Sequence, residues 1–261
     1  MPKKILLTRD NYFSPLMQKR YMGVSQFKDF EKCPASALAE IKGKFIKEKT
    51  PALLMGSYMD AYFEGTLDKF KADNPEIFKR DGTLKAEYVG VDNIIERIKK
   101  DKLFMKYAGG GQQQVIMTGV IEGVQVKIMI DSLLPNAIVD RKLMKDFEPI
   151  YLKEQGRLPW FEAWRYDLQG AVYQEIVYQN TGKKLPFILA AATKEKVTDY
   201  DLFEIEQDLL DFELGKFKEN VPIYDAMKKG IIVADRCDEC DYCRSTKKLA
   251  SIKKSSQFIY E

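Results

Sequence analysis

The chain has 261 residues, with 42 Lys and Arg against 39 Asp and Glu, no histidine and four cysteines. The absence of histidine excludes Ser-His-Asp and Cys-His catalysis and the His-Glu-x-x-His zinc helix. A metal site must therefore use carboxylates, cysteines, carbonyls or waters. The net charge of +3 does not by itself indicate a nucleic-acid partner, and the length suffices for a full hydrophobic core.

No apolar run reaches the roughly 18–20 residues of a membrane span, and the apolar run after the basic N-terminus is too short for a signal peptide. We therefore expect a cytoplasmic protein without a membrane partner. In that compartment the cysteines are reduced and can bind metal.

The first part of the chain is predicted to be helical. An arm at residues 1–20 is expected to be loosely ordered, and residues 66–90 are expected to be a mixed insertion with loops. Thr50-Pro51 is a good helix opening, because the hydroxyl can cap the helix and proline favours its first position. The predicted helices lie at residues 26–32, 51–63 and 91–107.

After Gly109-Gly110-Gly111 the pattern changes to strands, with a hairpin turn predicted at Glu122-Gly123. The predicted strands lie at residues 113–120, 124–131, 137–143, 187–192 and 202–205. The predicted helices lie at residues 160–179 and 207–229, the second with a break near Pro222. This order predicts an α/β domain with a mixed sheet, in which an early antiparallel meander meets a later crossover.

A turn at Pro135-Asn136 separates two apolar runs, and each run ends in a carboxylate. Asp131 ends the first run, and Asp140, with Lys142 two residues later, ends the second. With this turn as the centre, Asp131 lies directly opposite Asp140, and their Cβ atoms are about 4.5–5.5 Å apart. Lys142 shares their face, because it is two residues beyond Asp140. Two like charges this close repel each other, and a divalent cation would relieve the repulsion. The alternative is a solvated sheet edge where Lys142 simply pairs with Asp140.

The helix predicted at residues 160–179 carries a polar stripe. Tyr166, Gln169 and Tyr173 are spaced i, i+3 and i+7, so they share one face and could bind phosphate oxygens or the catalytic loop. The alternative is ordinary packing on the sheet. Aromatic residues at its start could stack on bases, although core packing is the commoner use. They are Trp160, Phe161 and Trp164.

The four cysteines form one candidate ligand set. Cys237, Cys240 and Cys243 are each separated by two residues, and the remote Cys33 precedes Pro34. This is the pattern that holds bacterial-ferredoxin-type 4Fe–4S clusters, whereas structural zinc more often uses two Cys-x-x-Cys pairs. The sequence favours a 4Fe–4S cluster, with Zn²⁺ or free thiols as the alternatives.

Together these motifs resemble the PD-(D/E)XK nuclease superfamily, in particular its RecB-type and RecE-type branch, which includes phage recombination exonucleases. Asp131, eight intervening residues and Asp140-x-Lys142 resemble the catalytic signature. The resemblance extends from about Ser25 to Arg244. The further matching segments are Ser25 to Cys33-Pro34, Gly56-Ser57-Tyr58-Met59-Asp60, Gln169-x-x-x-Tyr173 and the three C-terminal cysteines.

The resemblance implies a restriction-endonuclease-like α/β core, with a central mixed sheet flanked by helices. It implies one nuclease domain over residues 1–261, with a helical segment at about 20–108 and a cysteine-containing tail at about 231–261. Asp60 occupies the place of a family histidine that helps to bind metal. A carboxylate prefers Mg²⁺ or Mn²⁺, so Asp60, Asp131 and Asp140 are candidate metal ligands. Alternatively, Asp60 is an ordinary exposed helix residue.

The resemblance further implies a DNA exonuclease in phage or bacterial recombination or repair, beside a single-strand annealing protein. In it Lys142 positions water or stabilises charge, while Gln169 and Tyr173 lie beside the active site. Processive enzymes of this kind are often ring-shaped homo-oligomers. The alternatives are a structure-selective or restriction-type endonuclease, and a non-catalytic DNA-binding module with structural metal.

Overall fold

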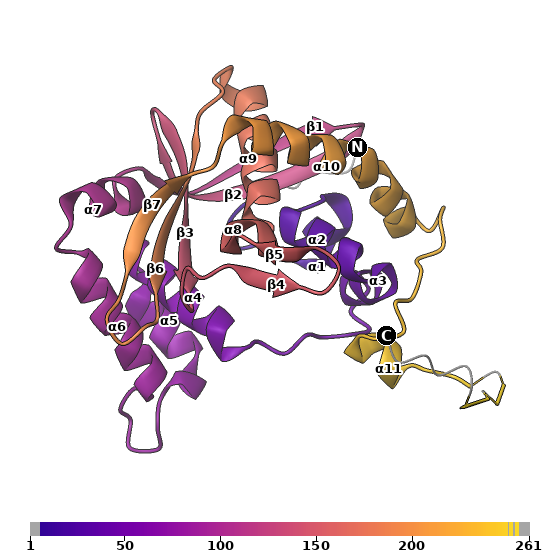
Figure 1. Cartoon of the computed structure of the whole chain (residues 1–261), viewed down its shortest axis with the longest axis horizontal. Coiled ribbons are helices and arrows are strands. Elements are labelled where there is room, and N and C mark those ends of the chain that lie inside the picture. The colour runs from indigo at the N-terminus through magenta and orange to yellow at the C-terminus, as the bar shows by residue number, and fades with distance from the viewer. Residues whose placement is uncertain (1–5, 250, 253, 256–261) are drawn as a thin grey trace.

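The computed structural model describes residues 6–249, 251–252 and 254–255. A five-stranded sheet crosses the molecule, with helices on both faces (Figure 1). Its strand order is β1-β2-β3-β6-β7, with β3 and β6 parallel and the other neighbours antiparallel. The sheet strands are β1 (Gln112–Ile121), β2 (Val124–Leu134), β3 (Ala137–Met144), β6 (Phe187–Thr193) and β7 (Tyr200–Glu204). The α/β architecture with a mixed sheet flanked by helices is confirmed.

The remaining elements surround this sheet. A small hairpin consists of β4 (Ile150–Leu152) and β5 (Gly156–Leu158). The helices are α1 (Pro15–Arg20), α2 (Val24–Lys32), α3 (Pro34–Ile41), α4 (Pro51–Phe63), α5 (Leu67–Asp73), α6 (Ala86–Ile98), α7 (Lys102–Gly109), α8 (Trp160–Ala163), α9 (Tyr166–Thr181), α10 (Gln207–Lys229) and α11 (Asp241–Ser245), with a 3₁₀ turn at Pro75–Ile77. None of the helices in the described part of the chain combines the length and apolar character of a membrane span.

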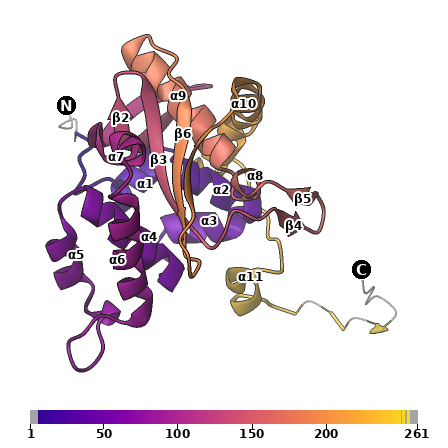
Figure 2. The same ribbon diagram turned by 60° about the vertical axis from the view of Figure 1, so that its left-hand side comes forward.

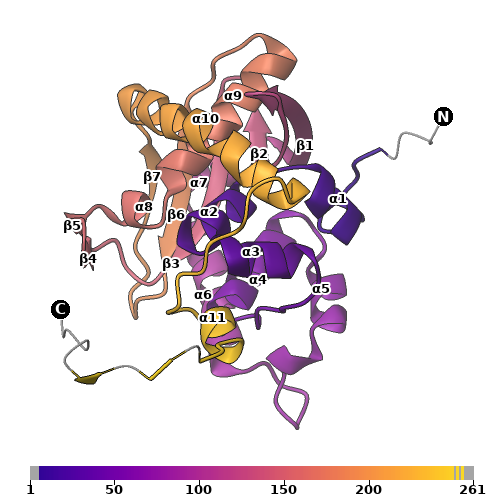
Figure 3. The same ribbon diagram turned by 90° about the vertical axis from the view of Figure 1, so that its right-hand side faces the viewer.

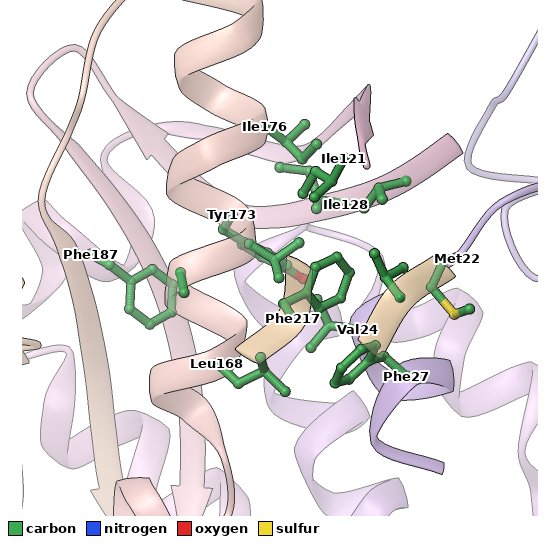
Figure 4. Packing of buried hydrophobic residues seen from close by; sticks show 14 of the residues in the cluster. Met22, Val24, Phe27, Ile121, Ile128, Leu168, Tyr173, Ile176, Phe187 and Phe217 are labelled. Carbon is green, nitrogen blue, oxygen red and sulfur yellow. The ribbon is translucent and has the colours of Figure 1, made fainter. Parts of the chain in front are cut away.

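Alternation along the strands divides the core between the two faces of the sheet. On one face, Ile128, Ile138 and Phe187 pack with Phe27 of α2 and Phe217 of α10 (Figure 4). On the other face, residues of β3 and β6 pack against α6 and α7, and α4 to α7 lie together there (Figure 2). All seven residues of β6 are buried, as expected for a strand covered on both faces.

Three local expectations are wrong in the first part of the chain. The arm is not loosely ordered within its described residues, because α1 buries Met17 and the ammonium of Lys127 binds the carbonyl of Tyr12. Residues 1–5 and parts of the predicted tail (250, 253 and 256–261) lie outside the described residues. Residues 66–90 are more helical than predicted, since they contain α5 and the start of α6. The helix predicted at residues 91–107 is two helices, because Asp101 caps α7.

The later helices differ from expectation in opposite ways. The predicted break at Pro222 is absent, because α10 continues through it with Phe217, Val221 and Met227 buried. A proline inside a helix costs about 3 kcal/mol, which this burial must offset. The helix predicted at residues 160–179 is instead interrupted at Arg165, which has φ 56° in the left-handed region.

Ion pairs hold the turn at Arg165. Its guanidinium binds Glu31 of α2 at 3.1 Å and the buried Glu213 of α10 at 2.7 Å. Asp167 is buried in the first turn of α9, and its carboxylate accepts the N–H of Leu168 at 2.7 Å. Burial raises the pKa of Asp167 to about 6, and nearby Glu213 adds to the shift. Charged side chains from three helices therefore fix the start of α9.

We predict that Gly170→Ala destabilises the fold. A Cβ on Gly170 would overlap the ring of Phe187 and lie 2.9 Å from Cδ2 of Leu210, so α9 could not keep its distance from β6. Overpacking of this kind costs about 1–3 kcal/mol in free energy of unfolding, measurable by urea denaturation. Gly215→Ala is the matched control, because nothing lies within 4 Å of its added Cβ. Equal stability of the two variants would contradict the packing described.

We predict that Asp167→Asn stabilises the protein once the pH exceeds about 6 but has almost no effect near pH 4. The folded-state pKa of about 6 exceeds the ordinary 3.8, so the folded protein loses stability as pH rises between these values. Asn removes that loss, raising the free energy of unfolding by about 1–3 kcal/mol at pH 8 and by almost nothing at pH 4. Asp208→Asn, in the exposed first turn of α10, is the control without this gain. The same gain in stability at both pH values would refute the raised pKa assigned to Asp167.

Candidate active site

The candidate site lies where β2 and β3 diverge. The residue pairs between these strands follow the register expected from the sequence and end at Ser132 opposite Val139. Beyond this point β2 continues beside β1, and β3 continues beside β6. Asp131 and Asp140 are the next residues of this register, at the mouth of the fork. The N–H of Arg141 donates to the Asp131 carboxylate at 2.9 Å, so a side chain takes the place of a ladder hydrogen bond.

The neighbouring strand β1 is also irregular beside Asp131. The β1–β2 pairing includes Gln113 and Val115 but not Gln114, which has φ 52°. A left-handed backbone at a residue other than glycine is unfavourable and persists where the surroundings hold it. The amide of Gln114 donates to the second carboxylate oxygen of Asp131 at 3.2 Å. Both strands beside Asp131 therefore supply donors to its carboxylate.

Asp140 is held on the face of the sheet covered by α9. Its side chain is almost fully buried, and Oδ1 accepts a hydrogen bond from Nε2 of Gln169 at 2.6 Å. Its other oxygen forms an ion pair with Lys142. The Lys142 ammonium also lies 4.5 Å from the centre of the Tyr166 ring. Two residues of the predicted stripe, Tyr166 and Gln169, therefore face the carboxylate–lysine pair.

Tyr173 occupies a different position from Gln169. Its hydroxyl donates to the main-chain carbonyl of Met129 in β2 at 2.9 Å, and its side chain is buried. It therefore connects α9 to the strand that carries Asp131.

Arg141 joins the fork to the opposite face of the sheet. Its fully buried side chain binds Asp60 of α4, with 3.1 Å between Nε and Oδ1. The same guanidinium donates to the carbonyl of Ala108 at 2.8 Å and to Oε1 of Gln113 at 2.7 Å, and it lies 4.7 Å from the centre of the Phe63 ring. Asp60 keeps 33% of its side chain exposed, so a cation can reach it.

The carboxylates repel one another. Burial raises the pKa of Asp60 to about 7 and that of Asp140 to about 6, and the charge of Asp131 raises both. Lys142 lowers both values, and Arg141 lowers that of Asp60. Burial alone would lower the pKa of Lys142, but Asp140, Tyr166 and Asp131 raise it. The lysine is therefore a cation, and Asp60 and Asp140 are harder to ionise than free carboxyls unless a positive charge stands beside them.

Sequence reasoning missed three polar residues of the site. For Arg141 the sequence suggested only a main-chain carbonyl near it as a metal ligand and no role for its side chain, although a charged residue in a buried strand was a usable signal. Gln114 reaches Asp131 only because β1 is irregular, which the sequence does not indicate. Lys28 of α2 donates to the carbonyl of Trp164 at 3.1 Å and lies 5.2 Å from the centre of the Tyr166 ring. The sequence does not indicate this contact, because Lys28 lies far from Trp164 and Tyr166 along the chain.

A second candidate centre lies away from the fork, where α11 packs beside α3 (Figure 3). The sulfur atoms of Cys33, Cys237, Cys240 and Cys243 all lie within 4.8 Å of one another. Cys33 and Cys243 are buried, with their sulfurs 3.6 Å apart. Main-chain N–H groups of Cys240 and Glu239 lower the pKa of Cys237 to about 6. The structure thus brings together all four cysteines that the sequence singled out.

Comparison with known proteins places this geometry in a family. Residues 23–246 match the family described as a PDDEXK-like domain of unknown function (DUF3799). The chain is also similar to a solved structure from Eubacterium rectale that bears the name "Putative exonuclease", with 44% identity and a TM-score of 0.93. That similarity covers 96% of this chain and 97% of the other. No curated protein matches the chain. The chain therefore belongs to the PDDEXK-like family.

Proposed function

We propose that this protein is a metal-dependent DNA exonuclease that hydrolyses phosphodiester bonds. The observation that carries the proposal is the meeting of Asp131, Asp140 and Lys142 at the β2–β3 fork. Family membership supports a nuclease, and the name of the Eubacterium rectale protein favours exonuclease action. The resemblance also implies a role in phage or bacterial recombination or repair, beside a single-strand annealing protein.

The residues at the fork fit Mg²⁺ or Mn²⁺. Hard divalent cations prefer carboxylate oxygens, and Asp131 and Asp140 offer them where their mutual repulsion needs a counter-charge. Asp60 is a third candidate ligand, because Arg141 binds only its Oδ1. When bound, such a metal lowers the pKa of a coordinated water and stabilises charge on the phosphate.

Other residues of the site act on a substrate or position the carboxylates. Lys142 presents a fixed positive charge beside Asp140, suited to orienting a water or stabilising a phosphate oxygen. Gln169 fixes the orientation of the Asp140 carboxylate, and Arg141 fixes Asp60 and Asp131. Tyr173 holds β2 through Met129, so we assign it a positioning role.

We predict that Asp140→Asn and Asp131→Asn abolish Mg²⁺-dependent degradation of linear DNA. Mutating a residue that only hydrogen-bonds to a metal ligand typically lowers metal affinity or activity by about 10–100-fold. Loss of a ligand itself should therefore lower kcat/KM by more than about 100-fold. The measurement is release of nucleotides from end-labelled linear DNA. Exonuclease action further predicts that closed circular DNA remains intact, whereas an endonuclease would nick it.

Asp201→Asn is the control for this experiment, because Asp201 is exposed on β7 and has no role in the fork. It should retain wild-type activity. Equal activity of wild type and the Asp140 variant, or no activity of wild type with either Mg²⁺ or Mn²⁺, would contradict the proposed function.

We also propose that the four cysteines hold one tetrahedral metal ion, with zinc the best match. Four sulfurs at the Zn–S distance of about 2.3 Å lie about 3.8 Å apart around one ion. The Cys33–Cys243 and Cys237–Cys243 sulfur distances are 3.6 and 3.9 Å. A four-iron cluster binds each cysteine at a separate iron, which sets the sulfurs farther apart. The observed spacing therefore favours zinc over the iron–sulfur cluster that the sequence favoured.

We predict about one zinc per chain in protein purified anaerobically, with no absorption band near 400 nm. Metal content is measured by mass spectrometry and the cluster by absorbance. Cys243→Ser should lower both the zinc content and the melting temperature, because this cysteine is buried and joins the C-terminal segment to α3. A brown protein containing about four irons per chain would overturn the zinc assignment in favour of the cluster.

A further inference from the structure

Two clefts approach the candidate carboxylates, and both include Ser57 and Asp60 in their walls. The larger, which we call the Trp164 cleft, has a volume of about 830 Å³ and is bordered by Lys142, Trp164, Tyr166 and Lys194. Its charged lining comprises four basic and three acidic residues. The other cleft, of about 620 Å³, has two basic and five acidic residues. The Trp164 cleft is therefore the less acidic of the two and repels a polyanion less than the other cleft does.

The turn that carries Trp164 is rigidly held, yet its indole is exposed. The carbonyl of Trp164 accepts a hydrogen bond from Lys28, and the next residue, Arg165, is kept in a left-handed conformation by Glu31 and Glu213. Trp164 as a whole residue nevertheless remains 52% exposed, whereas the nearby Trp160 is 4% exposed and packs against Phe147. The unfavourable conformation of Arg165, held by two ion pairs beside this exposed ring, makes the turn a candidate binding surface.

The position of Trp164 relative to the chemistry is also defined. Two residues later, the Tyr166 ring lies 4.5 Å from the Lys142 ammonium, which is paired with Asp140. Lys194 also borders the cleft, forms no ion pair among the described residues, and has its pKa lowered by burial. A phosphate oxygen would offset the cost of holding this charge.

We propose that the Trp164 cleft receives an unpaired strand end, with the Trp164 indole stacked on a base and Lys194 bound to a backbone phosphate. A base can stack on an indole only when its face is open, as in single-stranded DNA or a frayed end. The cleft volume falls in the range of 300–1,000 Å³ typical of small-ligand pockets, which suits a few nucleotides rather than a duplex. This inference rests on the proposed nuclease function and names the form of DNA that the same site takes.

The test compares Trp164→Ala, Trp164→Phe and wild type in binding a labelled single strand of about ten nucleotides, without added divalent metal. Stacking is worth about 1–3 kcal/mol per base, so Trp164→Ala should weaken binding roughly 10-fold. Phe retains a stacking face and should bind within about 3-fold of wild type. Phe212→Ala removes a comparably exposed ring on α10 and should bind normally.

Three further readouts separate stacking from a general structural effect. The strand should quench indole emission in wild type but not in Trp164→Phe, whose remaining Trp160 is buried. Lys194→Gln should reduce the slope of log affinity against log salt by about 0.7, the value for one phosphate contact on a single strand. Wild type should bind the single strand more tightly than a blunt duplex of equal length.

Unchanged affinity and unchanged KM in Trp164→Ala would overturn the inference, as would a preference for blunt duplex or no binding of the strand by wild type. Cleavage is assayed separately with Mg²⁺ or Mn²⁺. Cleavage by wild type that Trp164→Ala leaves unchanged would refute this inference alone. Trp164-dependent binding without cleavage would refute the proposed nuclease function and leave the binding site standing.

Discussion

The divergence of β2 from β3 is the constraint on which the rest of the site depends. The two strands separate after Ser132 and Val139, because β2 follows β1 while β3 follows the parallel strand β6. Main-chain groups released at the fork need new partners, and the Arg141 N–H finds one in the Asp131 carboxylate. The same separation leaves Asp131 and Asp140 unpaired as ladder residues, close enough for the charge of Asp131 to raise the pKa of Asp140. A sheet paired along its whole length would instead place ladder hydrogen bonds there.

Elements distant in sequence keep this fork in shape. The amide of Gln169 fixes Asp140 from α9, and the guanidinium of Arg141 ties the fork to Asp60 of α4. The start of α9 is itself held by Arg165 through Glu31 and Glu213. Helices on both faces thus restrain carboxylates whose repulsion would otherwise push them apart. Such preorganisation is what a site for a divalent cation and a phosphate requires.

Much of the fold could be predicted from the sequence, because the periodicity of strands and helices and the position of turns depend on neighbouring residues. The period of two in the strands and the turn at Pro135-Asn136 predicted the β2–β3 register. The helical spacing predicted that Tyr166, Gln169 and Tyr173 share one face of α9, whereas only the family resemblance implied that Gln169 and Tyr173 lie beside the active site. The irregular backbones at Gln114 and Arg165 were not predictable, because long-range hydrogen bonds and ion pairs stabilise them against local preference. The contact of Lys28 with Tyr166 was not predictable for the same reason, because only the packing of α2 against α9 brings the two side chains together.

A crystal soaked in Mn²⁺ and measured at the manganese absorption edge gives the most direct test of whether the fork is a metal site. The account predicts an anomalous difference peak between the carboxylates of Asp131 and Asp140, within about 2.0–2.6 Å of an oxygen from each. The peak should vanish in Asp140→Asn crystals of the same form. Full occupancy of manganese elsewhere, with none between these two carboxylates, would contradict it.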